Sequence, residues 1–319
     1  MYNENLKKYL NRPVSELIRV NQLEISEGQK ERHRLYSLLL MSIAAHYWNG
    51  NKYGRVGDYP LNEQDVSKGK YLDKDYLGHN IVALAVDAVG NIIDFDFNHN
   101  EIFNRSTEHA EIRTIQRIYK LTQIHDSWIV DLNKNKSKKS YTTFEDVSIY
   151  TSLESCSQCS GVMALAKVKE VIYLQQDPTM YMIGNIIRNL TEGTELEAPQ
   201  PIPGSSIELE YYEQLNRAYE EYLKVQKVIP FFIPHKGTPK ENPSITSFLC
   251  TKSAYDIYIN AKEKFEQLLS GKIKLKFKDY KPNKKGSTLV NALSNQQVLK
   301  EVSSFYHYAK ELGRRGTPH

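Results

Sequence analysis

The stretch that decides the fold is TSLESCSQCSGVMALAKVKEVIYL, residues 151–174. It places Cys156 and Cys159 between two apolar patterns typical of β-strands, at residues 147–153 and 168–174. The segment between these strands predicts a helix, and residues three apart on a helix share a face. Both thiols can therefore bind one ion from the start of this helix.

The start of that helix has its own signal. Ser155 and Gln158 match a Ser-x-x-Gln capping box, which predicts that the helix begins at the cysteines. The N-terminus of a helix carries partial positive charge, and this charge favours a thiolate over a thiol. The sequence thus predicts thiolates that can bind a metal.

A second motif lies upstream, where isoleucines and a leucine recur at three-residue steps over residues 108–124. Ser106 or Thr107 stands where an N-cap is needed, so His109 and Glu111 are expected to open this helix. His-x-Glu alone is a weak motif, because such pairs are common on helix surfaces.

The two motifs are more informative together. His109, Cys156 and Cys159 form a three-ligand set that leaves a fourth position for water, as in catalytic zinc sites. Zinc lowers the pKa of a bound water to about 7, and Glu111 could accept that proton and pass it to a substrate. The alternatives are a structural zinc site closed by Cys250 or another histidine, and a first-turn glutamate that only favours the helix dipole.

The remaining patterns predict an alternating α/β unit with a helical extension. A core helix is expected at residues 31–49, strands at 81–86, 92–98 and 206–209, and helices at 181–190 and 211–226. Prolines and Gly237 between residues 230 and 243 mark a boundary. We expect an N-terminal helical segment at 1–30, a zinc-binding α/β domain at 31–229, and a basic, mostly helical region at 244–319.

Composition limits the cellular setting and the partners. The chain is 40% hydrophobic and 25% charged, its longest apolar runs are too short to span a membrane, and its N-terminus lacks a secretory pattern. Three cysteines are too few for a disulfide framework, so a cytoplasmic location is expected. Lysines alternate with apolar residues at 272–278, which fits either a phosphate contact or an edge strand guarded by lysine.

The motifs HAE at residues 109–111 and SLESCSQC at 152–159 resemble the cytidine deaminase-like superfamily of zinc-dependent nucleobase deaminases. These segments are most similar to the branch of the superfamily that contains tRNA adenosine deaminases, cytosine deaminases and guanine deaminases. Two features depart from this family. Ser155 stands where the family usually has proline, and residues 131–140 form a lysine-rich insertion.

The resemblance implies a three-layer α/β/α core with a mixed sheet of roughly five strands, whose fourth and fifth strands are parallel. It implies one zinc ion per chain, Glu111 as the proton shuttle, and contacts to the base from Asn98 and Ala110, with Asn100 as the alternative to Asn98. Asn98 could equally be an ordinary residue at the end of a strand. Nothing in their spacing makes His79, His99 or His125 part of the site.

The implied reaction is hydrolytic deamination of adenine to hypoxanthine or of cytosine to uracil. The favoured substrate is a base in RNA, such as tRNA, or another polynucleotide. The alternatives are a free base, nucleoside or nucleotide, and a zinc-stabilised interaction module without catalysis. A homodimer is a further expectation from the resemblance, and a membrane partner is not expected.

Overall fold

The computed structural model describes residues 13–20, 23–49, 78–128, 143–228, 244–284, 287–288 and 291–313. Its centre is a five-stranded mixed sheet in the order β2-β1-β3-β4-β5. The strands are β1 (Val82–Val86), β2 (Ile92–Phe97), β3 (Ser148–Thr151), β4 (Glu170–Tyr173) and β5 (Gln200–Pro203). β1 is antiparallel to β2 and β3, whereas β3, β4 and β5 are parallel. The expected fold class, including the parallel fourth and fifth strands, is confirmed.

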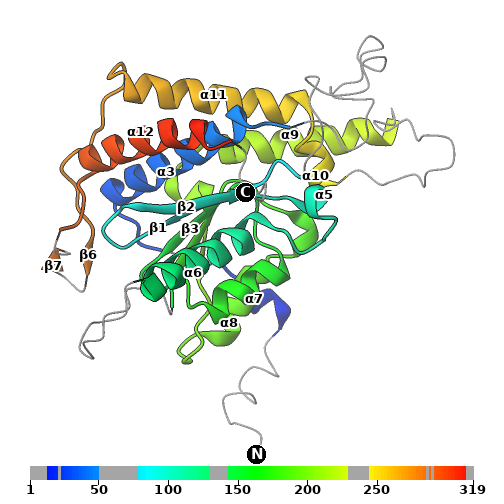
Figure 1. The fold of residues 1–319 in the computed structure, drawn as a ribbon. Coiled ribbons are helices and arrows are strands. Elements are labelled where there is room, and N and C mark those ends of the chain that lie inside the picture. The colour runs from blue at the N-terminus through cyan, green and yellow to red at the C-terminus, as the bar shows by residue number, and fades with distance from the viewer. Residues whose placement is uncertain are drawn as a thin grey trace, which may run out of the picture.

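Helices cover one face of the sheet around a small core (Figure 1). They are α6 (Ala110–Trp128), α7 (Ser157–Leu165) and α8 (Ile183–Thr191). The isoleucine pattern of α6 buries Ile112, Ile115 and Ile118 against Ile149 of β3 and Val171 of β4. This packing fixes the N-terminal ends of α6 and α7 beside the sheet, where the two sequence motifs lie.

The other face is covered by α3 (Glu27–His46), with α9 (Glu210–Val228) and α12 (Asn295–Glu311) beside it, and α11 (Lys252–Leu269) lies beyond them (Figure 1). α3 corresponds to the core helix expected at 31–49 but begins earlier, at Glu27. It is buried on nearly all sides, because α11 and α12 cover the face that would otherwise meet solvent.

Buried polar residues of α3 connect it to the C-terminal region. Arg32 donates to the carbonyl oxygens of Val89 and Leu293, at 3.0 and 2.8 Å. Glu31 accepts from the backbone N–H groups of Lys276 and Phe277, at 2.7 and 2.9 Å. These bonds satisfy charges that would be costly to bury unpaired, and they hold the chain after α11 against α3.

One sequence prediction in this part of the molecule is wrong, and one of two alternatives is excluded. The fifth strand is β5, whereas residues 206–209 lie in and after the 3₁₀ turn η3 (Gly204–Ile207). Residues 272–278 form no strand, because the backbone N–H groups of Lys276 and Phe277 bond to the Glu31 carboxylate instead of a neighbouring strand.

The other elements are short. They are α2 (Val14–Leu17), α5 (Asn100–Phe103), η2 (Pro178–Met180), α10 (Ile245–Phe248), β6 (Asn283–Lys284) and β7 (Ser287–Thr288). Residues 50–77, the insertion at 131–140 and the boundary at 230–243 lie outside the described residues, so the division into domains stays a prediction. Within the described ranges, no helix combines the length and apolarity needed to cross a bilayer.

Candidate active site

Three side chains from the two motifs meet at one end of the sheet. His109 Nδ1 lies 3.4 Å from Cys156 Sγ and 3.4 Å from Cys159 Sγ. All three potential ligand atoms lie within 4.8 Å of one another, and Cys159 is fully buried. The structure thus brings together the three residues that the sequence proposed as ligands.

The topology explains this meeting. β3 ends at Thr151, and the chain reaches Cys156 at the N-cap position of α7. His109 immediately precedes α6, and its carbonyl oxygen accepts from Arg113 N at 3.0 Å within the first turn. The carboxyl ends of parallel strands in open α/β sheets are the usual place for a site. Two helix N-termini converge there.

The donor set fits zinc. With zinc–nitrogen and zinc–sulfur bonds of about 2.1 and 2.3 Å, two ligands on one tetrahedral ion lie about 3.6 Å apart, close to the observed nitrogen–sulfur distances. Hydrogen bonds from Cys159 and His109 lower the pKa of Cys156 to about 4, despite burial. The hydrogen bond with Cys156, together with burial, raises the pKa of Cys159 well above its ordinary value. This asymmetry favours the thiolate form at Cys156, the form that binds a metal.

Glu111 lies beside this cluster and is 4% exposed. Its Oε1 atom accepts hydrogen bonds from Ser155 Oγ at 3.0 Å and Thr151 Oγ1 at 3.2 Å. Its Oε2 atom lies 3.4 Å from Cys159 Sγ. Two hydroxyl groups therefore fix one carboxylate oxygen and turn the other toward the metal ligands.

The Ser155 bond corrects the sequence analysis. Cys156, not Ser155, occupies the N-cap position of α7, and no side chain caps this helix. The capping box was a wrong prediction because the Ser155 hydroxyl is used by Glu111, on a helix distant in sequence. Neither Ser106 nor Thr107 directly precedes α6, since the helix begins only at Ala110.

Asn98 lies at the end of β2 with its side chain facing the same cavity. Its Oδ1 accepts from the backbone N–H groups of His79 and Asn100, at 3.3 and 3.2 Å, which orients the amide. Gly78 allows this approach, because a Cβ there would lie 2.5 Å from the Asn98 carbonyl oxygen. Neither Asn100 nor the buried Ala110 is among the described residues lining the cavity.

The cavity in front of the cluster measures about 220 Å³. Its described lining includes four residues that the sequence predicted for the site: Asn98, His109, Glu111 and Cys156. It also includes residues that sequence reasoning missed: His79, Ile81, Leu153, Glu154, Asp177, Thr179, Met180, Ser244, Ile245 and Thr246. Many of the missed residues lie in loops or at the start of α10. These segments are far apart in the sequence, so no local pattern indicates that they meet. His79 lines the cavity although its spacing in the sequence matches no ligand pattern.

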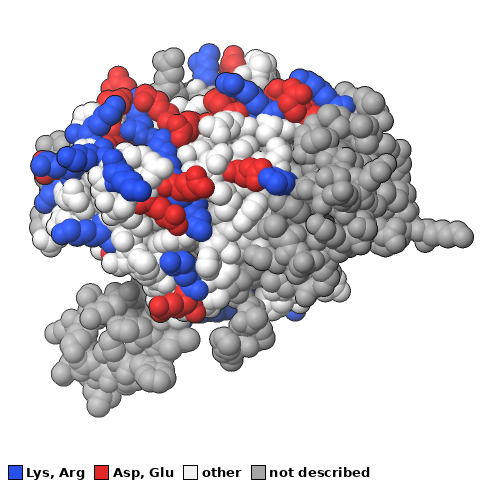
Figure 2. Space-filling view, turned by 90° about the horizontal axis from the view of Figure 1, so that it is seen from above, with Lys and Arg blue, Asp and Glu red and all other residues white. Residues whose placement is uncertain are grey.

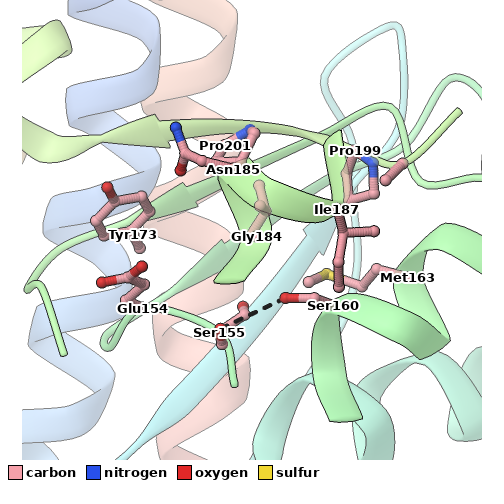
Figure 3. A pocket seen from close by; sticks show the side chains of 12 residues that line it. Glu154, Ser155, Ser160, Met163, Tyr173, Gly184, Asn185, Ile187, Pro199 and Pro201 are labelled. Carbon is pink, nitrogen blue, oxygen red and sulfur yellow. Dashed lines mark hydrogen bonds between the residues drawn. The ribbon is translucent and has the colours of Figure 1, made fainter. Parts of the chain in front are cut away.

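Glu154 lines both this cavity and a smaller one, which Ser155, Tyr173 and Asn185 also line (Figure 3). Burial raises the pKa of Glu154 to about 7. Its Oε2 accepts from Asp177 N at 3.0 Å, which ties the loop after β4 to the loop after β3. In the smaller cavity, Ser160 Oγ donates to the Ser155 carbonyl oxygen at 3.4 Å.

Comparison with protein families is decisive for the segment that carries both motifs. The family model described as "Cytidine and deoxycytidylate deaminase zinc-binding region" matches residues 64–175, which contain all three ligands and Glu111. Residues 64–175, about a third of the chain, therefore resemble this zinc-binding region. The deaminase region confirms the family resemblance, the zinc cofactor and the enzyme class, a hydrolase acting on carbon–nitrogen bonds.

Solved structures give more distant comparisons. A tRNA:A34 deaminase is 22% identical, with 39% of this chain and 82% of that chain covered and a TM-score of 0.28. A guanine deaminase from Bacillus subtilis is 27% identical over 32% and 53%, with a TM-score of 0.25. A Thermotoga maritima deaminase/reductase acting on phosphoribosylamino-pyrimidines is 15% identical over 61% and 42%, with a TM-score of 0.33. No curated protein matches the chain.

Proposed function

We propose that this chain hydrolytically deaminates a nucleobase, with one zinc ion held by His109, Cys156 and Cys159. The observation that carries the proposal is the position of Glu111. Its Oε2 lies 3.4 Å from a ligand sulfur, while its Oε1 is held by two hydroxyl groups. A glutamate that only favoured a helix dipole would not need two buried hydroxyl partners from another part of the chain.

Each residue has a distinct role in this proposal. A bound zinc ion supplies the Lewis acid that makes water nucleophilic near neutral pH. Glu111 takes one proton from the attacking water and gives it to a ring nitrogen; it then moves the remaining hydroxyl proton to the amino group, so that the C–N bond breaks, ammonia leaves and the carbonyl forms. Asn98, oriented by two backbone N–H groups, contacts the base from the opposite wall.

The described lining of the cavity favours an uncharged substrate. It contains Glu154 and Asp177 in addition to Glu111, and no lysine or arginine among the described residues. A phosphate group beside this wall would meet acidic side chains and, among the described residues, no lysine or arginine. We therefore favour a free base or nucleoside over the polynucleotide that the sequence suggested.

The placement of the C-terminal lysines agrees with this preference. Residues 272–278 follow the C-terminal end of α11, an 18-residue helix, so they lie about 27 Å along its axis from the end that adjoins α10 and the cavity. On the face seen from above, basic and acidic side chains are mixed rather than gathered into one basic surface (Figure 2). Three lysines of α11 pair with Asp256, Glu266 and Glu210.

Ammonia release by the zinc-loaded protein tests the proposal. Free bases, nucleosides, nucleotides and short RNAs are supplied separately, and zinc is measured on the same sample. We expect one zinc per chain and release from a base or nucleoside. Release from RNA alone would restore the polynucleotide hypothesis, and a zinc-loaded protein that releases no ammonia from any of them would refute deamination of these substrates. The homodimer and the cytoplasmic location stay predictions.

A further inference from the structure

Part of the cavity wall comes from outside the family-matched segment. Ser244, Ile245 and Thr246 line the cavity together with His109 and Glu111. These three residues begin α10 in the C-terminal region, whereas the matched region ends at residue 175. The C-terminal region therefore contributes to the site as well as to the core.

The position of α10 is fixed from behind. Phe248 is fully buried and packs against the rings of Tyr219 and Tyr222 of α9, with centroids 5.5 and 5.7 Å away. Tyr222 Oη and Ser247 Oγ are hydrogen bonded at 2.7 Å. On the other side, Asn80 Nδ2 donates to the Leu249 carbonyl oxygen at 2.9 Å. The residues that face the cavity are thus held by a rigid support.

The hydroxyl groups of Ser244 and Thr246 lie on this wall, and they differ in the number of hydrogen bonds that they make within the protein. Ser244 Oγ accepts from Ser247 N at 3.3 Å as the cap of α10, and it is also bonded to Thr246 Oγ1 at 3.0 Å. The bond to Ser244 is the one hydrogen bond found for Thr246 Oγ1 among the described residues. A hydroxyl group has one donor and two acceptor positions, so Thr246 retains capacity for a ligand.

We propose that Thr246 is a specificity-determining residue, whose hydroxyl bonds to a second polar group on the ring of the base. The inference rests on the proposed function. The metal ligands and Glu111 act on the amino group that is lost, whereas Thr246 belongs to a wall contributed by a different region of the chain. Cytosine and guanine carry such a second exocyclic group, and adenine does not. A site built to bond to a polar group discriminates against analogues that lack it.

The test compares each base with its analogue that lacks the exocyclic oxygen: cytosine with 4-aminopyrimidine, and guanine with 2-aminopurine. Ratios of kcat/KM are measured for the natural chain, Thr246→Val and Thr246→Ser. For the pair that contains the substrate, we expect Thr246→Val to lower the ratio about fivefold to tenfold, the effect of one hydrogen bond. Thr246→Ser keeps the hydroxyl and should keep the ratio.

A matched control and a binding measurement separate the possible failures. Thr122→Val removes a hydroxyl that bonds to Ile118 O on α6 at 2.9 Å, and it should leave the ratio unchanged. Calorimetry in a Glu111→Gln background, where turnover is blocked, should show the same loss of discrimination in Kd. An active protein whose ratios are unaffected by Thr246→Val would overturn this inference alone. A protein that deaminates adenine but neither deaminates nor binds any of the four probes would also overturn this inference and leave the proposed function standing, whereas one that releases no ammonia from any base or nucleoside would overturn both.

Discussion

Glu111 is the residue on which the chemistry depends. Replacing it by glutamine keeps the shape and removes the group that moves the proton, so we expect ammonia release to fall by about 10²–10⁴-fold. Zinc content should stay at one per chain, because Glu111 is outside the ligand set. Metal analysis and ammonia release on one preparation check this. Glu210→Gln, at a half-exposed ion pair on α9, is the matched control. Retention of full turnover in Glu111→Gln would remove Glu111 from the mechanism.

Ser155 is predicted to position Glu111. Ser155→Ala removes one of the two hydrogen bonds to Oε1, and a bond to a charged group contributes about 1.5–3 kcal/mol. We expect kcat to fall about tenfold or more with zinc content unchanged. Ser304→Ala, at an exposed serine of α12, should leave kcat unaltered. Unchanged kcat in Ser155→Ala would mean that Thr151 alone holds the carboxylate.

At this scale the sequence predicted the reacting groups but not their supports. His109, Glu111, Cys156 and Cys159 follow from a spacing that helix geometry makes meaningful. The bond from Ser155 to Glu111 joins residues 44 positions apart, so no local pattern could reveal it. The same holds for Thr246, because its place on the cavity wall depends on packing between α9 and α10.

Helix α3 contains a buried titratable side chain, His33. His33 is 3% exposed, and its Nδ1 is hydrogen bonded to Tyr150 Oη at 2.8 Å. Burial lowers the pKa of His33 from 6.5 to about 4. Between these values the unfolded chain binds the proton and the folded chain does not. The free energy of unfolding therefore decreases as pH falls from about 6.5 to 4, by about 3 kcal/mol from this group.

His33→Gln should weaken that dependence. Urea unfolding at pH 7 and pH 4.5 gives the loss of stability for each protein, and the variant should lose less than the natural chain. His307→Gln changes an exposed histidine on α12 and should lose as much as the natural chain. Equal losses in all three proteins would show that His33 does not contribute to the acid sensitivity.

Element type was predictable wherever a periodic pattern was long, as in α6 and α9. The fifth strand was placed wrongly because β5 has the sequence QPIP, in which proline conceals the strand. Its pairing with β4 is set by tertiary contacts. The burial of α3 on nearly all sides was equally hidden, because α11 and α12, which cover it, lie more than 200 residues later in the chain.

For the whole molecule, the C-terminal helices are part of one structure with the sheet. Phe265 of α11 is fully buried in the core that also contains Leu39 of α3 and Leu84 of β1. Phe265→Ala should reduce the free energy of unfolding by about 3–5 kcal/mol. Trp48 is buried against Tyr255 and Tyr258 of α11, so its fluorescence reports on this packing.

Whether the C-terminal helices and the site unfold together is tested by following unfolding at both places. Unfolding followed by Trp48 fluorescence and by loss of ammonia release should give one shared midpoint, and Phe265→Ala should lower both together. Phe277→Ala, at a side chain 39% exposed, should change neither by more than about 0.5 kcal/mol. Two separate transitions would instead show that the C-terminal region folds independently, as the sequence boundary suggested.

The central claim is that zinc at His109, Cys156 and Cys159 supports hydrolysis of a nucleobase. The most direct measurement is ammonia release from free bases and nucleosides by the zinc-loaded protein, by the protein after chelation, and by the same protein after zinc is restored. The account predicts release that disappears with the metal and returns with it, at one zinc per chain. A protein that binds no zinc, or that releases ammonia equally without it, would contradict the account.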